Sequence, residues 1–265
     1  MINQKDNIKD EFQEMWLEKI SNKQRKERII RAFVIIKNVA EKQIKYLKKY
    51  EESKNKKEIG FMYYQNTLIS IWKNVDFAIS LGKGKNKQFA FYPARNVLEN
   101  GFRLEYFLNQ KEDGRNKIAI IEFLRVIKRA YEHEKIKDGD FEEYNNQYKY
   151  FSSITGDFPS IDDFKDSQNK SFPEIWELIR DTKLEGGSID WYHQYRSLCE
   201  VTHGKLFRTM MASWDESSEY VWSLMYIQFM AIAILKMTDL YIYGTISKEV
   251  VETIKKAEEI IKKPI

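Results

Sequence analysis

Residues 189–204 hold the side chains whose types and spacing are best suited to chemistry, in the segment IDWYHQYRSLCEVTHG. On a helix with about 100° between residues, Arg196, Glu200 and His203 fall within roughly 60° of one another. A guanidinium, a carboxylate and an imidazole would then project into one space. A histidine that titrates near neutral pH can transfer protons, and an arginine can hold a phosphate. These groups could cleave RNA through the substrate's own 2′-hydroxyl without a metal ion.

The same cluster is open to three interpretations. It lies opposite the apolar side of its helix, as an ordinary solvated face does, and Arg196 and Glu200 form a simple i,i+4 pair. The groups could therefore line a functional cleft, form a solvated face or belong to a buried structural network. In the last two cases the chain would be a non-enzymatic helical interaction or regulatory protein. Tyr192 lies beside the helix face that carries Arg196, Glu200 and His203, and Tyr195 directly precedes Arg196. Both tyrosines are therefore candidate supporting residues.

A second stripe of charge crosses residues 88–110. Arg95, Glu99 and Arg103 repeat every four residues on a segment that is apolar around most of its remaining circumference. A helix that is apolar nearly all round is usually buried. An unpaired buried ion costs several kcal/mol, whereas an exposed i,i+4 pair contributes only about 0.2–0.5 kcal/mol. We therefore expect the stripe to have partners or to line a wet cleft, and to lie beside residues 189–204 as a supporting part of the site.

The order Arg196, six residues, His203 resembles the Arg-x(4–6)-His signature of the HEPN superfamily of all-helical domains. That superfamily includes metal-independent endoribonucleases of toxin, CRISPR-associated and abortive-infection systems. The resemblance implies that Arg196 and His203 are catalytic and need no cofactor. It implies RNA cleavage or RNA binding in defence or as a toxin, a protein partner such as an antitoxin, and a homodimer that brings two motifs together. Ser197 stands where many active members carry Asn, Asp or His.

Two segments together resemble a second group of proteins. The sequences ARNVLEN at 94–100 and YRSLCEVTHG at 195–204 are similar to paired helices, Arg-x3-Glu and Tyr-Arg-x-Leu-Ser-x-x-x-His, of a group of bacterial all-helical proteins with no established activity. This resemblance covers about residues 60–245. Cys199 stands where a small residue such as serine is expected. The resemblance implies a helical fold and no particular reaction.

Other chemistries have weaker patterns. The histidines His133, His193 and His203 form no HExxH motif and no Cys/His cluster, so we predict no metal site. Cys199 has His203 at i+4, but a mid-helix thiol is more often a packing residue than a nucleophile. The turn LGKGKNK at 81–87 lacks the GxxxxGK[ST] spacing and follows a predicted helix, so it does not predict a phosphate loop.

Composition narrows the class of protein. The 265 residues include one cysteine, four prolines and 11 glycines, which favours long helices and a reducing compartment. The N-terminal sequence MINQKDNIKDEF lacks the apolar stretch of a signal peptide. The net charge of +4, from 44 basic and 40 acidic residues, permits an anionic partner without requiring one. We expect a cytoplasmic protein with no membrane association.

Helical periodicity covers most of the chain. We predict an all-α fold, a single elaborated HEPN-like bundle of about eight to ten helices over residues 1–265. Its parts are N-terminal helices in 1–57, a core bundle with the motifs in 58–245 and a basic C-terminal helix in 246–265. The predicted helices span residues 5–20, 24–50, 58–81, 88–110, 115–136, 141–154, 171–184, 189–204, 220–235 and 247–263.

Three segments lead to more specific predictions. Residues 220–235 carry no charge but are short for a membrane span of about twenty residues, so we predict a buried core helix. Ser171 and Glu174 have the spacing of a capping box that would begin a helix. Residues 156–170 predict a surface loop or lid between helices that pack together.

Overall fold

The computed structural model describes residues 21–53, 58–84, 86–136, 142–155, 170–202 and 216–262. The predicted all-α fold is confirmed, since these residues form nine α-helices, one short 3₁₀ helix and no strand. The helix predicted over 5–20 and most of the predicted loop at 156–170 lie outside them. The elements are α2 (Asn22–Ser53), α3 (Ile59–Leu81), η1 (Lys87–Phe89), α4 (Phe91–Leu108), α5 (Glu112–Ile136), α6 (Glu142–Thr155), α7 (Ile175–Arg180), α8 (Gly187–Thr202), α10 (Glu216–Tyr243) and α11 (Lys248–Lys262).

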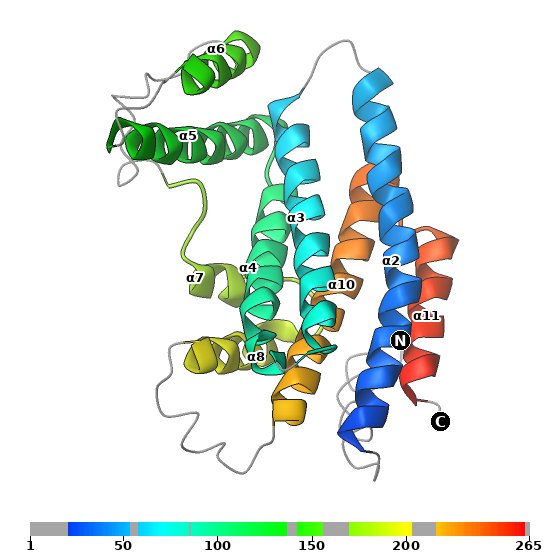
Figure 1. Cartoon of the computed structure of the whole chain (residues 1–265). Coiled ribbons are helices and arrows are strands. Elements are labelled where there is room, and N and C mark those ends of the chain that lie inside the picture. The colour runs from blue at the N-terminus through cyan, green and yellow to red at the C-terminus, as the bar shows by residue number, and fades with distance from the viewer. Residues whose placement is uncertain are drawn as a thin grey trace.

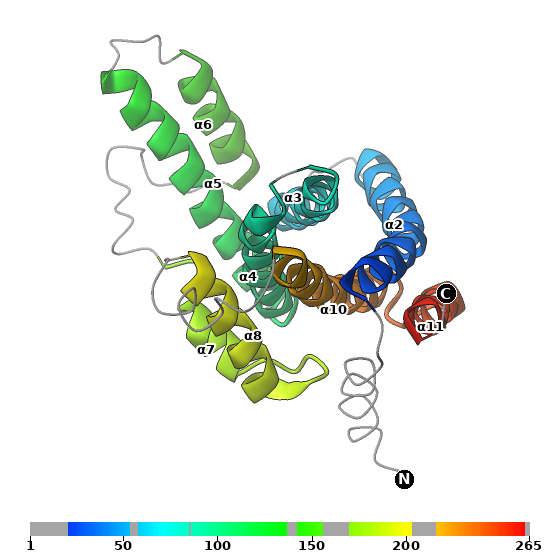
Figure 2. The same ribbon diagram turned by 60° about the horizontal axis from the view of Figure 1, so that its bottom comes forward.

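Helix α10 lies at the centre of the bundle (Figures 1 and 2). It packs against α2 on one side and α4 on another, while α3 packs against α4 and α11 packs against α2. Helices α5 and α6 form a hairpin that extends away from this core, and α7 and α8 pack on α4. Helix α4 therefore packs against α3 and α10 of the bundle and also against α7 and α8, so it connects the core to these two helices.

The apolar composition of α10 is explained by its position. One helix in the described residues, over Tyr220–Tyr243, is long and apolar enough to span a membrane, and 61% of its most apolar window is buried inside the protein. Its buried face includes a carboxylate, Asp239, which accepts hydrogen bonds from Gln43 Nε2 at 2.7 Å and from the backbone N–H of Ser247 at 2.8 Å. The predicted buried core helix is confirmed.

A glycine allows α4 and α10 to approach each other closely. A Cβ atom added at Gly101 would lie 2.1 Å from the Sδ of Met230, which is fully buried. No side chain larger than hydrogen fits there without movement of the methionine. Residue 101 is about 200° around the helix from residue 99, so this contact turns the charged stripe of α4 away from the core.

The helix predicted to begin at Ser171 is wrong in its start. Helix α7 begins four residues later, with Glu174 as its N-cap, and the Glu177 carboxylate accepts from the backbone N–H of Glu174 at 3.0 Å. The Ser171 hydroxyl instead donates to the carboxylate of Glu122 and accepts from Arg125 Nη1 at 2.6 Å. A capping pattern in sequence does not reveal that partners on α5 occupy the hydroxyl.

The same helix also ends earlier than predicted, at Arg180 and not near residue 184. Glu105 of α4 is buried, and its carboxylate accepts from the Thr182 hydroxyl and, at 2.7 Å, from the backbone N–H of Lys183. In a longer helix, the Lys183 N–H would donate to a carbonyl of the same helix. Here it donates to Glu105 instead, so the helix does not continue. Glu105 thereby fixes the entry into α8.

Candidate functional site

Helix α8 begins after a left-handed turn. Gly186 and Gly187 have φ values of 103° and 75°, which side chains other than glycine rarely adopt. Ser188 follows these glycines and lies in the first turn of α8. Trp191 Nε1 donates to the Glu185 carbonyl at 3.0 Å and so ties the turn to the helix that follows it.

The buried face of α8 packs across α4. Trp191, Tyr195 and Leu198 are the buried side chains of α8, at helical spacing. The Trp191 ring meets the Phe102 ring edge-on, with centroids 5.5 Å apart, whereas Tyr195 reaches Glu99, nearer the start of α4. Contacts near the start of α8 thus involve later residues of α4, and later residues of α8 contact earlier ones.

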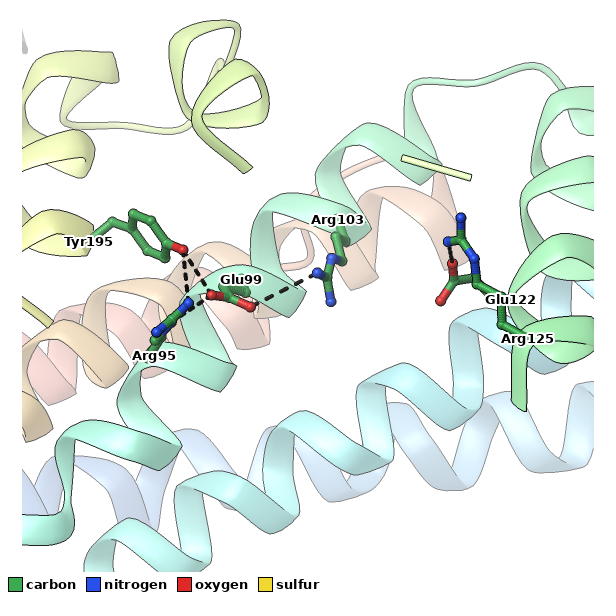
Figure 3. Close-up of polar contacts among 6 residues, drawn as sticks. All are labelled: Arg95, Glu99, Arg103, Glu122, Arg125 and Tyr195. Atoms are coloured by element: carbon green, nitrogen blue, oxygen red, sulfur yellow. Dashed lines mark hydrogen bonds and ion pairs between the residues drawn. The ribbon is translucent and has the colours of Figure 1, made fainter. Parts of the chain in front are cut away.

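Glu99 is the centre of a polar network between these two helices (Figure 3). Its Oε1 accepts from Arg95 Nε at 2.7 Å and from the Tyr195 hydroxyl at 2.9 Å. Arg103 Nη2 lies 3.9 Å from the other carboxylate oxygen. The exposed fractions are 26% for the Arg95 side chain, 17% for Glu99 and 39% for Arg103. The partners expected for the charged stripe are therefore present, at a half-buried position.

The Glu99 network keeps Arg95 charged and Tyr195 protonated. Burial alone would lower the pKa of Arg95, but the hydrogen bond to Glu99 and the electrostatic contacts with Tyr195, Cys199 and Glu99 together outweigh burial, so the pKa lies above its usual value. Burial, followed by contacts with Cys199 and Glu99, raises the pKa of Tyr195. The folded-state pKa of Tyr195 then exceeds the unfolded value of about 10, so its hydrogen bond stabilises the fold below that pH and is lost only at higher pH. Tyr195 thus stays a phenol that donates to Glu99.

The opposite side of α8 faces solvent. Arg196 follows Tyr195 directly and is exposed, as are Tyr192 and His193. Ser197, on the same helix, donates its hydroxyl to the His193 carbonyl at 2.8 Å. The structure therefore presents a guanidinium, an imidazole and an aromatic ring on a helix whose other face is fixed by α4.

The remaining predicted site residues are described only in part. Glu200 belongs to α8, but its side chain lies outside the described residues, as does His203 entirely. His133 lies on α5, and its side chain is also outside them. Cys199 is half-buried and packs against the core, as a packing thiol does. Within the described part of the chain, no group of three or more His, Cys, Asp or Glu side chains could hold a metal ion.

A second polar network, which the sequence did not indicate, lies beyond Arg103. Arg125 Nη1 is 2.6 Å from Glu122 Oε1 (Figure 3). Both side chains also form hydrogen bonds with the Ser171 hydroxyl. Burial and the nearby Glu122 raise the pKa of Tyr63, while Thr67 and Arg103 lower it. Arg103 therefore acts electrostatically on Tyr63 as well as on Glu99. The only sequence signal was an i,i+3 pair on α5, because the serine comes from a distant segment.

Removal of the Glu99 carboxylate should destabilise the protein. Glu99→Ala leaves the half-buried Arg95 guanidinium and the Tyr195 hydroxyl without their acceptor, so we expect the free energy of unfolding to fall by about 1–3 kcal/mol. A fully buried pair would lose more, but these side chains remain in partial contact with water. Urea denaturation measures the loss.

Glu252→Ala is the matched control for that substitution. Glu252 also forms an i,i+4 pair, 3.6 Å from Lys248, but its side chain is 52% exposed. We expect its removal to cost less than about 0.5 kcal/mol. Equal losses for the two variants would contradict a structural role for the Glu99 network.

Comparison of the chain with family models, with curated proteins and with solved structures gave no significant match. The structure brings Arg95, Glu99 and Arg103 of α4 together with Tyr195 of α8. It places Arg196 and Tyr192 on the exposed face of α8.

Proposed function

We propose that this chain is a metal-independent endoribonuclease of the HEPN type, in which Arg196 holds the scissile phosphate and His203 transfers protons. The observation that carries the proposal is the fixed position of α8. Tyr195 is buried and bonded to Glu99, and the next residue is an exposed arginine. A guanidinium on a fixed helix can bind a phosphate in one geometry, because a packed neighbour limits its movement.

The proposed reaction uses only groups of the substrate and the protein. A base removes the proton of a ribose 2′-hydroxyl, and the oxygen attacks the adjacent phosphorus. The bond from phosphorus to the 5′-oxygen of the next nucleotide breaks, and an acid gives that oxygen a proton. The products are a 2′,3′-cyclic phosphate and a 5′-hydroxyl. Arg196 stabilises the negative charge that gathers on the phosphate oxygens during the attack.

The need for both a base and an acid supports a homodimer, in which two copies of the motif would lie together. We predict a dimer in solution with at least about 1,000 Å² of buried surface. Light scattering at micromolar concentration should then give twice the chain mass of 31.8 kDa. A monomer under those conditions would contradict a composite site. The role proposed with this activity is that of a toxin or an antiviral effector in the cytoplasm, with an antitoxin as a protein partner.

Incubation of the purified protein with total RNA in the presence of EDTA tests the proposal. We expect discrete cleavage products with the wild-type protein and none with Arg196→Ala. Cleavage that EDTA abolishes would contradict the metal-independent mechanism, and intact RNA after incubation with the wild-type protein would contradict the activity.

One observation favours a competing function. Glu99 joins α4 to α8 through Arg95 and Tyr195, and such a clamp would be useful in any helical protein. The chain would then be a non-enzymatic interaction or regulatory protein with a structural cluster. In that case Glu99→Ala would still destabilise the fold, but the wild-type protein would leave RNA intact.

A further inference from the structure

The region just before the charged stripe of α4 carries two exposed aromatic rings. Phe89 of η1 is 43% exposed and Tyr92, in the first turn of α4, is 46% exposed. Their ring centroids are 6.3 Å apart and the ring planes differ by 24°, so the rings are stacked. The Tyr92 ring also contacts the buried ring of Phe91, with centroids 4.3 Å apart. The exposed Tyr92 ring thus packs against a buried side chain.

The turn that leads to these rings is held by α10. The Tyr220 hydroxyl, at the start of the buried part of α10, is 3.2 Å from the Ala78 carbonyl and 3.1 Å from the Ile79 carbonyl, at the end of α3. A Cβ atom at Gly82 would lie 2.2 Å from that hydroxyl oxygen, so only glycine fits. Ala90, between the two rings in sequence, is fully buried. The rings are therefore held in place before any ligand binds.

The chain segment that carries the rings is basic. No aspartate or glutamate occurs in the sequence between Asp76 and Glu99, whereas this interval contains three lysines and Arg95. Among the described residues of the interval, Lys83 is exposed and Lys87 is half-buried. Exposed aromatic rings on a segment that carries cations and no acids fit a ligand that has both flat unsaturated rings and negative charge.

The rings also lie on the same side of α4 as the Glu99 network. Tyr92 precedes Arg95 by three residues, which is about 60° around the helix and about 4.5 Å along it. Tyr195 of α8 contacts Arg95 and Glu99, so the part of α4 that carries Tyr92 lies about one turn before this contact. Tyr92 therefore lies within about one helical turn of the contact between α4 and α8 that fixes the position of Arg196.

We infer that Phe89 and Tyr92 form a base-stacking platform for single-stranded RNA. This inference rests on the proposed function and specifies its substrate class. Successive unpaired bases can stack on exposed rings while lysines and arginines contact the phosphates, and this mode tolerates any base. In a duplex the base faces are covered by neighbouring base pairs, so double-stranded RNA would not use the platform.

Binding of a labelled single strand of about twelve nucleotides tests the platform. The strand carries 2′-O-methyl groups, so it lacks the 2′-hydroxyl and is not cleaved by the proposed route. A strand with the same backbone and no bases, and a duplex of the same sequence, are compared by fluorescence anisotropy. We expect the wild-type protein to bind the base-bearing single strand most tightly.

The double variant Phe89→Ala/Tyr92→Ala should bind that strand about 10- to 100-fold more weakly, and no better than the strand without bases. Tyr150→Ala is the control, because Tyr150 is 40% exposed on α6, at the far end of the molecule (Figure 1). It should bind as the wild type does. Circular dichroism checks that each variant is folded. Equal binding of base-bearing and abasic strands by the wild type, no binding of either, or unchanged binding by the double variant would overturn the inference.

Cleavage of unmodified RNA, measured in parallel, separates the two proposals. Cleavage that depends on Arg196 combined with normal binding by the double variant would reject the platform and retain the ribonuclease. Binding that depends on the two rings, with no cleavage by the wild type, would retain the platform and reject the ribonuclease.

Discussion

Replacement of His203 by alanine is expected to lower the rate of RNA cleavage by about 10²–10⁴-fold, the usual contribution of a positioned general acid or base. The 2′-hydroxyl and the leaving 5′-oxygen both need proton transfer near neutral pH, and an imidazole is the side chain with an ordinary pKa in that range. The chain contains three histidines. Of these, His203 is the one that follows Arg196 in the order of the Arg-x(4–6)-His signature, whereas His193 precedes the arginine. Initial rates on a labelled RNA measure the loss.

His193→Ala is the control for that experiment. His193 is exposed on α8 and is ten residues from His203, which corresponds to about 15 Å along a helix. We expect its cleavage rate to stay near that of the wild type. A protein that still cleaves RNA without His203, or that loses cleavage equally without His193, would remove the proposed assignment and return the cluster to a structural interpretation.

Arg196→Ala is expected to reduce cleavage by a similar factor, about 10²–10⁴-fold, because the charge on the phosphate would lose its main stabilising group. Arg196→Lys should restore only part of the rate, since an ammonium cannot make two parallel hydrogen bonds to one phosphate. The side chain is exposed, so neither variant should change the free energy of unfolding by more than about 0.5 kcal/mol. Cleavage rates and urea denaturation, measured on the same preparations, separate the two effects.

Arg180 provides the matched control for the arginine variants. It lies on the neighbouring helix α7, is exposed and pairs with Asp181 at 2.7 Å. Arg180→Ala removes the same charge from a nearby surface, and we expect it to leave cleavage unchanged. Equal losses for the two alanine variants would indicate a general effect of positive charge. Full activity of Arg196→Lys would contradict bidentate binding of the phosphate.

Periodicity was sufficient to predict the helices that build the site. The apolar positions of α4 surround a narrow stripe of Arg95, Glu99 and Arg103, and this contrast correctly indicated that the charges have partners. The absence of charge over 220–235 correctly indicated a core helix, since a helix in the middle of a bundle must be apolar on several sides. Both inferences use local sequence and one physical rule.

Contacts between distant segments were beyond the reach of such rules. Tyr195 was predicted only as a supporting residue, and its acceptor, Glu99, lies 96 residues away. Ser171 matched a capping pattern, yet partners 46 and 49 residues earlier in the chain engage its hydroxyl. Short polar side chains can serve a local cap or a distant partner with the same atoms. Only the three-dimensional arrangement decides between these uses.

Identification of the product ends tests the central claim most directly. The purified protein is incubated in EDTA with a labelled RNA of defined sequence, beside the same RNA with a 2′-O-methyl group at the cleaved position. We predict a 2′,3′-cyclic phosphate on one product, a 5′-hydroxyl on the other and no cleavage of the methylated strand. Products with a 5′-phosphate and a 3′-hydroxyl, or cleavage of the methylated strand, would contradict attack by the 2′-hydroxyl and with it the proposed roles of Arg196 and His203.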